Sequence, residues 1–573
     1  ADGAPMLAYN ADSGELFGSL VHFPAQKSPP KQREVWSWDY GVYLGDILEA
    51  NATYNVVGNV NEHGLAIGET TFGGLSTLDC SPSACPDCGI MDYGSLIWMT
   101  LQRARNARHA IDVIDSLVQT YGYASEGESF SIVDTKEAWL MELIGKGKHG
   151  KGAVWVATKV PDGEILAHSN QARTRHFLRG NDEVRHSADV VSFARELGLY
   201  PQSAKDSDFS FSDVYDPVVF SGARFAEART WHLYTLLGEA GVMDPYLDYA
   251  KGLNLTNRMP LFLKPKKPVS LQDAMAAMRS RFEGSWFDPS GTQRADVGAG
   301  PGHSAYRWRP LEWKSGDQTF LNERTVGTQQ TAWHYIAHLQ PGVPSPFAAM
   351  LWWAPDDSST GVKIPLFGGA TDIPKMFGDP IGQIPGAGVD APEADAQTAH
   401  FESAFWVWNA VAQFCYGERA DVANAHVNSA RDGLQEKLID EAKEALDLAV
   451  TLWNAGKRDA AIDAATKFGI AAGERTHHAW KDVWRQLLAL TRDGMFLKST
   501  TPHLPLCPPG DSDLKRARKC TYRLIPAYKE SGYDAEWYAR IVADGDNYVH
   551  YNVPTTAARA DAEHNARKLR VIR

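Results

Sequence analysis

The feature that most constrains the fold is a series of short apolar segments, separated by turns, between residues 129 and 170. The segments SFSIVD, EAWLMELIG, GAVWVATKV and GEILAHSN each have the length of one strand. Asp-Thr-Lys at 134–136 and Pro-Asp-Gly at 161–163 separate segments and are typical turn sequences. Consecutive hairpins of this kind form an antiparallel meander. We therefore predict four neighbouring antiparallel strands, the last of which ends at Asn170.

Other parts of the chain have helical periodicity. Between residues 93 and 121, apolar residues recur at spacings of three and four, and residues 400–493 also favour helix. One apolar stripe in this second region ends before Gly456 and is formed by Leu434, Leu438, Ala442, Ala445, Ala449 and Leu452. Because strands precede and follow the first helical region, the sequence predicts an α+β fold with sheets covered by helices.

Composition limits the classes of partner. The 573 residues are 44% apolar and 22% charged, as in a globular protein, and the formal charge is −13. No run of 18 apolar residues predicts a transmembrane helix, and no basic cluster predicts nucleic acid as a partner. The chain has no GxGxxG, P-loop, HExxH or GxSxG motif, so we expect no cofactor and favour hydrolysis or binding. A homo-oligomer stays open.

Changes in composition along the chain predict four parts. Residues 1–376 form the predicted core, and residues 377–397 are rich in glycine and proline, as in a surface connection. Residues 398–500 form a helical region that packs on the core. Residues 501–573 form a C-terminal extension.

Cysteines and sequons indicate an oxidising compartment. The candidate disulfide residues are Cys80, Cys85, Cys88, Cys415, Cys507 and Cys520. The CxxC at 85–88 lacks a fourth zinc ligand at a suitable spacing and a thioredoxin-like surrounding, so disulfides are favoured over zinc or redox chemistry. Cys507 and Cys520 enclose a short loop, for which we predict a mutual disulfide. With glycosylation sequons at Asn51 and Asn254, this favours a secreted, lysosomal or vacuolar protein whose leader has been removed.

Polar residues at predicted strand ends are the candidates for chemistry. Asp12 follows MLAYNA, Thr70 and Thr71 end the strand at 64–72, and Asn170 and Arg173 end the meander. If these ends share one rim, an asparagine amide there can stabilise the negative charge of a tetrahedral intermediate. The alternative is that these residues only cap the sheets.

Five long motifs carry a resemblance to a known family. They are NEHGLAIGETTFGG, DYGSLIWMTLQRARNARHAIDVIDSL, YGYASEGESFSIVDTKEAWLMELIGKG, KGAVWVATKVPDGEILAHSNQAR and NERTVGTQQTAW. In order and spacing they resemble the cysteine dipeptidases of the N-terminal-nucleophile hydrolase superfamily, the dipeptidase A and secernin relatives. The resemblance implies a four-layer αββα sandwich of two antiparallel sheets. It also implies a cysteine-type dipeptidase, with a small peptide as its partner.

The same resemblance implies roles for the rim residues. Asn170 matches a side-chain oxyanion donor, and Thr70 or Thr71 matches the position of a backbone donor. Asp12 matches an acidic residue near the nucleophile, and Arg324 of the NERT motif is a weaker match.

The chain departs from the family at the nucleophile. Family members begin with a cysteine whose own α-amine is the base, about ten residues before the Asp-Gly that matches residues 2–3. The sequence begins at Ala1, and its six cysteines lie elsewhere. We expect the nucleophilic cysteine on a strand upstream of Ala1. Two alternatives stay open: an acylase, ceramidase or phospholipase B-like amide or lipid-ester hydrolase of the same fold, or a non-catalytic extracellular protein derived from such an enzyme.

Overall fold

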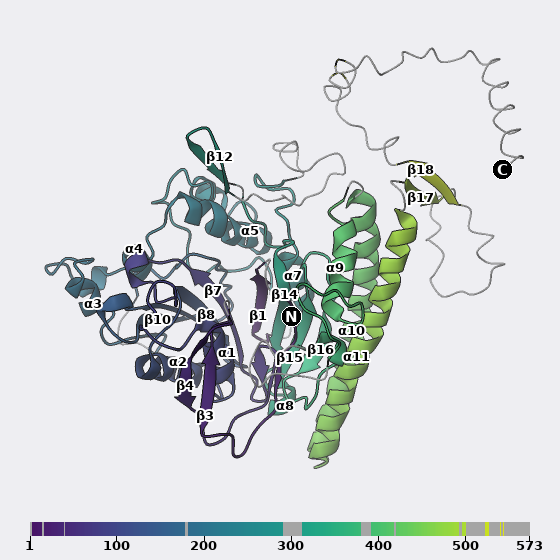
Figure 1. Ribbon diagram of the computed structural model, residues 1–573, viewed down its shortest axis with the longest axis horizontal. Coiled ribbons are helices and arrows are strands. Elements are labelled where there is room, and N and C mark those ends of the chain that lie inside the picture. Colours follow the sequence, from purple (N-terminus) through teal and green to yellow (C-terminus); the bar gives the residue numbers. More distant parts are fainter. Residues whose placement is uncertain are drawn as a thin grey trace, which may run out of the picture.

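The computed structural model describes most of the chain (Figure 1). The described residues are 3–13, 17–38, 41–177, 182–289, 312–321, 323–379, 391–417 and 420–491, with 495–499, 522–526, 539 and 543 beyond them. Cys507 and Cys520 lie outside this part, so their predicted disulfide stays a prediction.

The larger sheet has eight antiparallel strands. In spatial order they are β11 (Val184–His186), β10 (Ala153–Lys159), β9 (Ala138–Gly145), β8 (Gly127–Val133), β7 (Ala66–Phe72), β6 (Val60–Asn61), β5 (Val56–Val57) and β2 (His22–Phe23). The meander predicted from the turn sequences forms β8 to β10. The turn between β6 and β7 closes with Gly64 at φ +78°, donating its N–H to the Asn61 carbonyl at 3.1 Å.

The smaller sheet has four antiparallel strands. Their order is β1 (Met6–Asp12), β14 (Thr331–Leu339), β15 (Ala349–Pro355) and β16 (Ile364–Phe367). Strand β1 therefore joins the start of the described chain to a segment more than 300 residues away. Among the described residues β1 pairs with β14 alone, so one of its two edges is open.

The two sheets pack face to face, and helices cover their outer faces (Figure 1). Leu7 and Tyr335 of the small sheet share a core with Ala66 and Val133 of the large one, and the Tyr335 hydroxyl donates to the Ile67 carbonyl at 2.8 Å. Helices α1 (Tyr93–Leu101) and α2 (Ala107–Tyr121) cover the large sheet. The small sheet is covered by α9 (Ala404–Phe414), α10 (Ala420–Asn454) and α11 (Arg458–Leu490). The expected α+β sandwich with a helical C-terminal region is confirmed.

The remaining elements are short. The strands are β3 (Gln32–Trp36), β4 (Tyr43–Leu48), β12 (Glu312–Ser315), β13 (Gln318–Leu321), β17 (Met495–Ser499) and β18 (Tyr522–Pro526). The helices are α3 (Ser192–Glu196), α4 (Phe211–Tyr215), α5 (Ala228–Leu237), α6 (Leu247–Ala250), α7 (Leu271–Met278) and α8 (Ser345–Ala348). None of the helices in the described part is long and apolar enough to cross a membrane.

The fourth strand of the predicted meander is wrong. Residues 163–170 do not join the sheet; instead Ile165 forms an isolated bridge with Leu263, and β10 pairs on that side with β11. The alternating pattern of GEILAHSN is therefore satisfied by contacts with a later loop. As a result, Asn170 lies on an irregular segment and not at a strand end.

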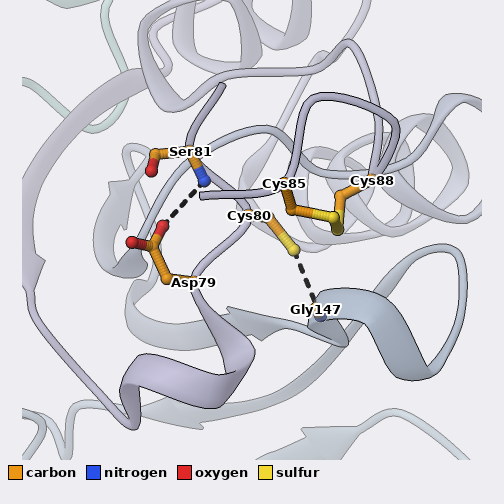
Figure 2. The surroundings of a disulfide bond; sticks show 6 residues. All are labelled: Asp79, Cys80, Ser81, Cys85, Cys88 and Gly147. Carbon is orange, nitrogen blue, oxygen red and sulfur yellow. Dashed lines mark hydrogen bonds between the residues drawn. A yellow bond between two sulfur atoms is a disulfide. The ribbon is translucent and has the colours of Figure 1, made fainter. Parts of the chain in front are cut away.

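The described cysteines are only partly paired (Figure 2). Cys85 and Cys88 form a disulfide within the CxxC. Cys80 and Cys415, which we expected as disulfide candidates, are buried free thiols. The Cys80 sulfur accepts the Gly147 N–H at 3.2 Å, and burial raises the pKa of Cys80 to about 11 and of Cys415 to about 12. Cys415 lies at the end of α9 in the core beneath the small sheet, and Cys80 lies in the core beneath the large one, so the two cannot meet.

Candidate active site

Asn170 lies against the end of strand β7. Its Nδ2 donates to the main-chain carbonyl of Thr71 at 2.6 Å. The segment that carries Asn170 therefore lies beside the last residues of β7, although it is not a strand of the sheet. The two candidate positions that the sequence placed at separate strand ends are in direct contact.

Two arginines fix the orientation of the Asn170 amide. Arg229 of α5 and Arg324 donate to Asn170 Oδ1 at 2.7 and 2.6 Å. A guanidinium can only donate, so the amide oxygen must face the arginines and the nitrogen must face Thr71. The Asn170 side chain is thus held in one orientation by three partners, as a pre-organised hydrogen-bond donor requires.

Asp12 reaches the same place from the other sheet. A register shift between Ala11 and Asp12 interrupts the pairing of β1 with β14, and such bulges redirect side chains. The Asp12 carboxylate accepts from the Thr331 hydroxyl at 2.7 Å and lies 3.6 Å from Arg324 Nε. The ends of the two sheets therefore meet at one cluster, formed by Asp12, Thr71, Asn170, Arg229 and Arg324, which we call the Asn170 cluster.

The electrostatics of the Asn170 cluster favour an anionic group. Burial raises the pKa of Asp12, and Arg324 and Arg229 oppose this shift. Arg229 is 7% exposed, and burial followed by the neighbouring Arg324 guanidinium holds its pKa well below the usual range. Glu227 also acts on Arg229, but it forms its own ion pair with Arg173 at 3.2 Å. Two guanidiniums thus share the Asp12 carboxylate, and a further negative charge would stabilise them.

Thr71 also presents its backbone N–H on the Asn170 side. In an antiparallel ladder, the N–H and C=O of one residue point to the same edge of the strand. The Thr71 carbonyl accepts from Asn170, and the Ile67 carbonyl, four residues earlier, accepts from Tyr335 and not from β8. The Thr71 N–H therefore lies on this edge, beside the Asn170 amide. Of the two threonines, Thr71 is thus the one whose N–H points to the edge beside Asn170.

Thr70 has a different set of contacts. Its hydroxyl donates to the Ser169 carbonyl at 3.0 Å and lies 2.8 Å from Nδ1 of His168. The other ring nitrogen of His168 lies 2.7 Å from the Ser131 hydroxyl, and burial lowers the pKa of His168 to about 4. This neutral imidazole ties the Asn170 segment to β7 and β8. Thr70 therefore stabilises the position of the segment that carries Asn170, and its side chain is not part of the Asn170 cluster.

A pair of buried carboxyl groups lies behind Thr71. The Thr71 hydroxyl donates to Glu128 Oε2 at 3.0 Å, and Tyr9 of the small sheet donates to Glu69. Burial and then the neighbouring Glu69 raise the pKa of Glu128 well above its usual range. Burial and the Glu69 carboxyl thus favour the protonated form of Glu128, because two buried carboxylates in contact repel each other.

Arg173 does not belong to the Asn170 cluster, contrary to the sequence-based expectation. Its guanidinium donates to the Ala167 and Pro260 carbonyls at 2.8 Å each and pairs with Glu227 at 3.2 Å, and its side chain is 2% exposed. Its backbone N–H donates to Glu142 at 2.5 Å. Arg173 thus binds the segment after Asn170 to α5 and to the loop at 260, which is a structural role.

The sequence analysis missed Arg229. It lies on α5, directly after a π-helical turn at Gly222–Glu227, and such turns are frequent at functional sites. A single arginine in a helix carries no signal in one sequence, because most arginines in helices face solvent. Thr331 was missed for a similar reason, since it begins an apolar strand.

Comparisons with known proteins identify the family of this chain. The model of a family described as "Peptidase family C69" matches residues 37–431, which is more than half of the chain. The chain belongs to peptidase family C69. The matched C69 region includes Thr71, Asn170, Arg229 and Arg324, whereas Asp12 precedes it. The cysteine dipeptidase family expected from the five motifs is therefore confirmed, and membership of a C69 peptidase family agrees with an enzyme.

Several curated relatives are similar to this C69 chain. A "Probable dipeptidase" of Salmonella dublin is 23% identical over 383 residues, which cover 64% of this chain and 78% of that protein. A "Probable dipeptidase A" of Streptococcus pyogenes serotype M1 is 25% identical over 325 residues, 56% of this chain and 59% of the relative. A "Dipeptidase" of Bifidobacterium longum (strain NCC 2705) is 21% identical over 338 residues, 57% of this chain and 54% of the relative. The chain thus spans little more than half the length of the last two.

Proposed function

We propose that the protein is a cysteine-type dipeptidase. Asn170 Nδ2 and the Thr71 N–H stabilise the oxyanion of its tetrahedral intermediate. The observation that carries this proposal is the fixed Asn170 amide, held by Thr71, Arg229 and Arg324. Two donors on one edge are the arrangement that stabilises a tetrahedral intermediate, and the loss of one such donor costs about 3 kcal/mol of transition-state stabilisation. The names of the curated relatives support dipeptides as substrates.

The charge of the Asn170 cluster supports a small zwitterionic substrate. A dipeptide carries a carboxylate one residue from its scissile amide, and Arg229 and Arg324 provide two guanidiniums beside the proposed oxyanion donors. Arginine binds carboxylates with two parallel hydrogen bonds. An acylase, ceramidase or phospholipase B-like reaction needs an apolar surface next to the scissile bond, and the buried charges here favour the dipeptide over these alternatives.

We propose that the nucleophile is a cysteine on a strand that pairs with the open edge of β1. Such a strand, joined to β1 by a turn that includes Gly3, runs antiparallel to β1, and Gly3 has φ +76°, which suits a tight turn. A partner as long as the seven residues of β1 places its first residues opposite Asp12. Its thiol would then lie at the Asn170 cluster.

The proposed reaction has two steps. The thiolate sulfur attacks the amide carbonyl, the C–N bond breaks, and the leaving amine takes the proton that the terminal α-amine removed from the thiol. Water then attacks the thioester, with the α-amine again as base, and the S–C bond breaks to release the acid and restore the thiol. Asn170 and Thr71 donate to the oxyanion in both steps. Asp12 lies where it can hold the α-ammonium.

The test uses the native protein isolated from its source. Amino-terminal sequencing should find cysteine upstream of the sequence ADG, hydrolysis of an unblocked dipeptide should be measurable, and iodoacetamide should abolish it with one added carbamidomethyl group on that cysteine. A native N-terminus without cysteine, together with absent hydrolysis, would overturn the proposal and favour the non-catalytic alternative. Faster hydrolysis of an N-acyl amide or a lipid ester than of any dipeptide would favour the other hydrolases.

We also propose that the protein is secreted, lysosomal or vacuolar. The asparagines of both sequons, Asn51 and Asn254, are exposed and so accessible for glycosylation, and the Cys85–Cys88 disulfide suits an oxidising compartment. Peptide mass spectrometry of the native protein should find glycans on these asparagines. Unmodified asparagines at both positions would contradict this location.

A further inference from the structure

A second charged site lies away from the Asn170 cluster, in a cavity of about 630 Å³. Its walls come from the ends of α5 and α7, the loop that follows α7, and α10. Nothing in the proposed dipeptidase reaction uses this cavity. Its unusual property is an excess of buried positive charge.

Arg279, at the wall of this cavity, has two buried donor atoms without an acceptor among the described residues. It follows directly after α7 and lines the cavity. Its Nε and NH2 atoms are buried and have no hydrogen-bond partner in the described structure. The remaining nitrogen lies 3.7 Å from Asp432, which is 55% exposed. Burial and then the Arg431 guanidinium lower the pKa of Arg279 to about 9. One edge of a guanidinium is thus left with its donors unsatisfied.

Two further basic groups, Lys363 and His334, are close enough to Arg279 to interact with its charge. Lys363 is fully buried, and its Nζ has no hydrogen-bond partner among the described residues. Burial, followed by Arg279 and Arg431, lowers the pKa of Lys363 well below its usual range. His334 of β14 is equally buried, and neither ring nitrogen has a partner within the described part of the chain. Burial, followed by Lys363 and Arg279, lowers the pKa of His334. These groups act on one another and raise the positive potential at one spot.

The acidic residues of the cavity do not balance this charge. Five cationic and three acidic side chains line it. The acids already have partners: Asp273 pairs with Lys267 at 3.0 Å, Glu283 with Arg281 at 3.6 Å, and Asp432 with Arg431 at 2.9 Å. This leaves Arg279 with Asp432 alone, at 3.7 Å, as its acidic partner among the described residues of the cavity. Burial of a charge without a partner is unfavourable, and an anion in the cavity would compensate it.

A bound oxyanion is the group that compensates such a site. The Nε–NH2 edge of arginine forms two parallel hydrogen bonds with two oxygens of a phosphate or carboxylate. A phosphate dianion carries two negative charges and therefore compensates the positive charge of this site better than a carboxylate, which carries one. We propose that this cavity binds the phosphate group of a small molecule, or free phosphate, through Arg279, with Lys363 and Arg431 adding to the field.

The experiment is calorimetric titration of the full chain at constant ionic strength and pH 7. The ligands are inorganic phosphate, glycerol phosphate as a phosphate monoester, and acetate. We expect saturable one-to-one binding of a phosphate compound. Comparison of the first two ligands identifies the natural ligand. Equal or tighter binding of inorganic phosphate assigns free phosphate, and tighter binding of glycerol phosphate assigns a small molecule that carries a phosphate group. Absence of saturable binding of both, or acetate binding as tightly, would overturn the proposal.

Two variants and one control place the binding in this cavity. Arg279→Gln removes the unsatisfied guanidinium, and Lys363→Met replaces a buried amine by an apolar side chain of similar size, which the fold should tolerate. Each should weaken phosphate binding by about tenfold or more. Arg475→Gln removes a half-exposed arginine of α11 that pairs with Glu441 at 2.6 Å, and should leave binding unchanged. Unchanged affinity in folded Arg279→Gln protein, checked by circular dichroism, would overturn the proposal.

Discussion

The side-chain amide of Asn170 donates to the Thr71 carbonyl at 2.6 Å, and this contact joins an irregular segment to the end of a sheet strand. Arg229 and Arg324 hold the amide oxygen from the other side. Because three partners fix the amide, its nitrogen needs no reorientation when charge develops on a substrate oxygen. Pre-organised donors of this kind provide a large part of the rate enhancement in acyl transfer.

Arg229→Gln should weaken the binding of dipeptides with a free carboxylate. The KM for an unblocked dipeptide should rise by about tenfold to a hundredfold, as expected for the loss of a charge-assisted hydrogen bond. The KM for the corresponding dipeptide amide should change much less, because that substrate lacks the carboxylate. Arg175→Gln, which removes an exposed arginine paired with Asp213, serves as the control. Equal losses with both substrates would show that Arg229 does not bind the carboxylate.

Arg173→Met should destabilise the fold without a direct effect on chemistry. The substitution leaves Glu227 buried without its cation, which costs about 3–5 kcal/mol at a site where the two side chains are 2% and 1% exposed. The double variant Arg173→Met with Glu227→Gln should recover part of this loss in a urea unfolding titration. If the single variant unfolds at the same urea concentration as the parent, the structural assignment of Arg173 is wrong.

Asp356 should make stability fall as the pH rises. Burial raises its pKa to about 7, whereas the unfolded value is about 3.9. Between these values the folded state binds more protons than the unfolded state, so the free energy of unfolding decreases from about pH 4 to about pH 7. Asp356→Asn removes this loss, and asparagine tolerates the residue's φ of +64°.

The variant should therefore be more stable than the parent by about 1–3 kcal/mol at pH 8, with a smaller difference at pH 4. Denaturant titrations at the two pH values measure this. A stability difference that is the same at both would contradict the raised pKa.

Much of the architecture could be predicted because it is local. The turn at 134–136 joins β8 to β9, the turn sequence at 161–163 follows the end of β10, and the stripe from Leu434 to Leu452 lies on α10, which ends just before Gly456. GEILAHSN could not be placed, because its alternation fits a strand of the sheet as well as the bridge to Leu263 that it forms. Arg229 could not be found, since its role depends on α5 lying over a segment 59 residues earlier in the chain. Arg173 was misassigned because it lies close to Asn170 in the sequence. Closeness in sequence does not show whether a side chain faces a cleft or is buried in the core.

The rate of hydrolysis of an unblocked dipeptide by the native protein and by its Asn170→Ala variant, expressed from the same full-length gene, tests the central claim most directly. The variant should fold, bind substrate with a similar KM and lose about 10²–10³ in kcat, as expected for one oxyanion donor. Asn257→Ala, which removes a surface asparagine bonded to the Pro245 carbonyl at 2.7 Å, should keep the parent rate. Equal kcat for the parent and a folded Asn170→Ala variant would contradict the active site proposed at the Asn170 cluster.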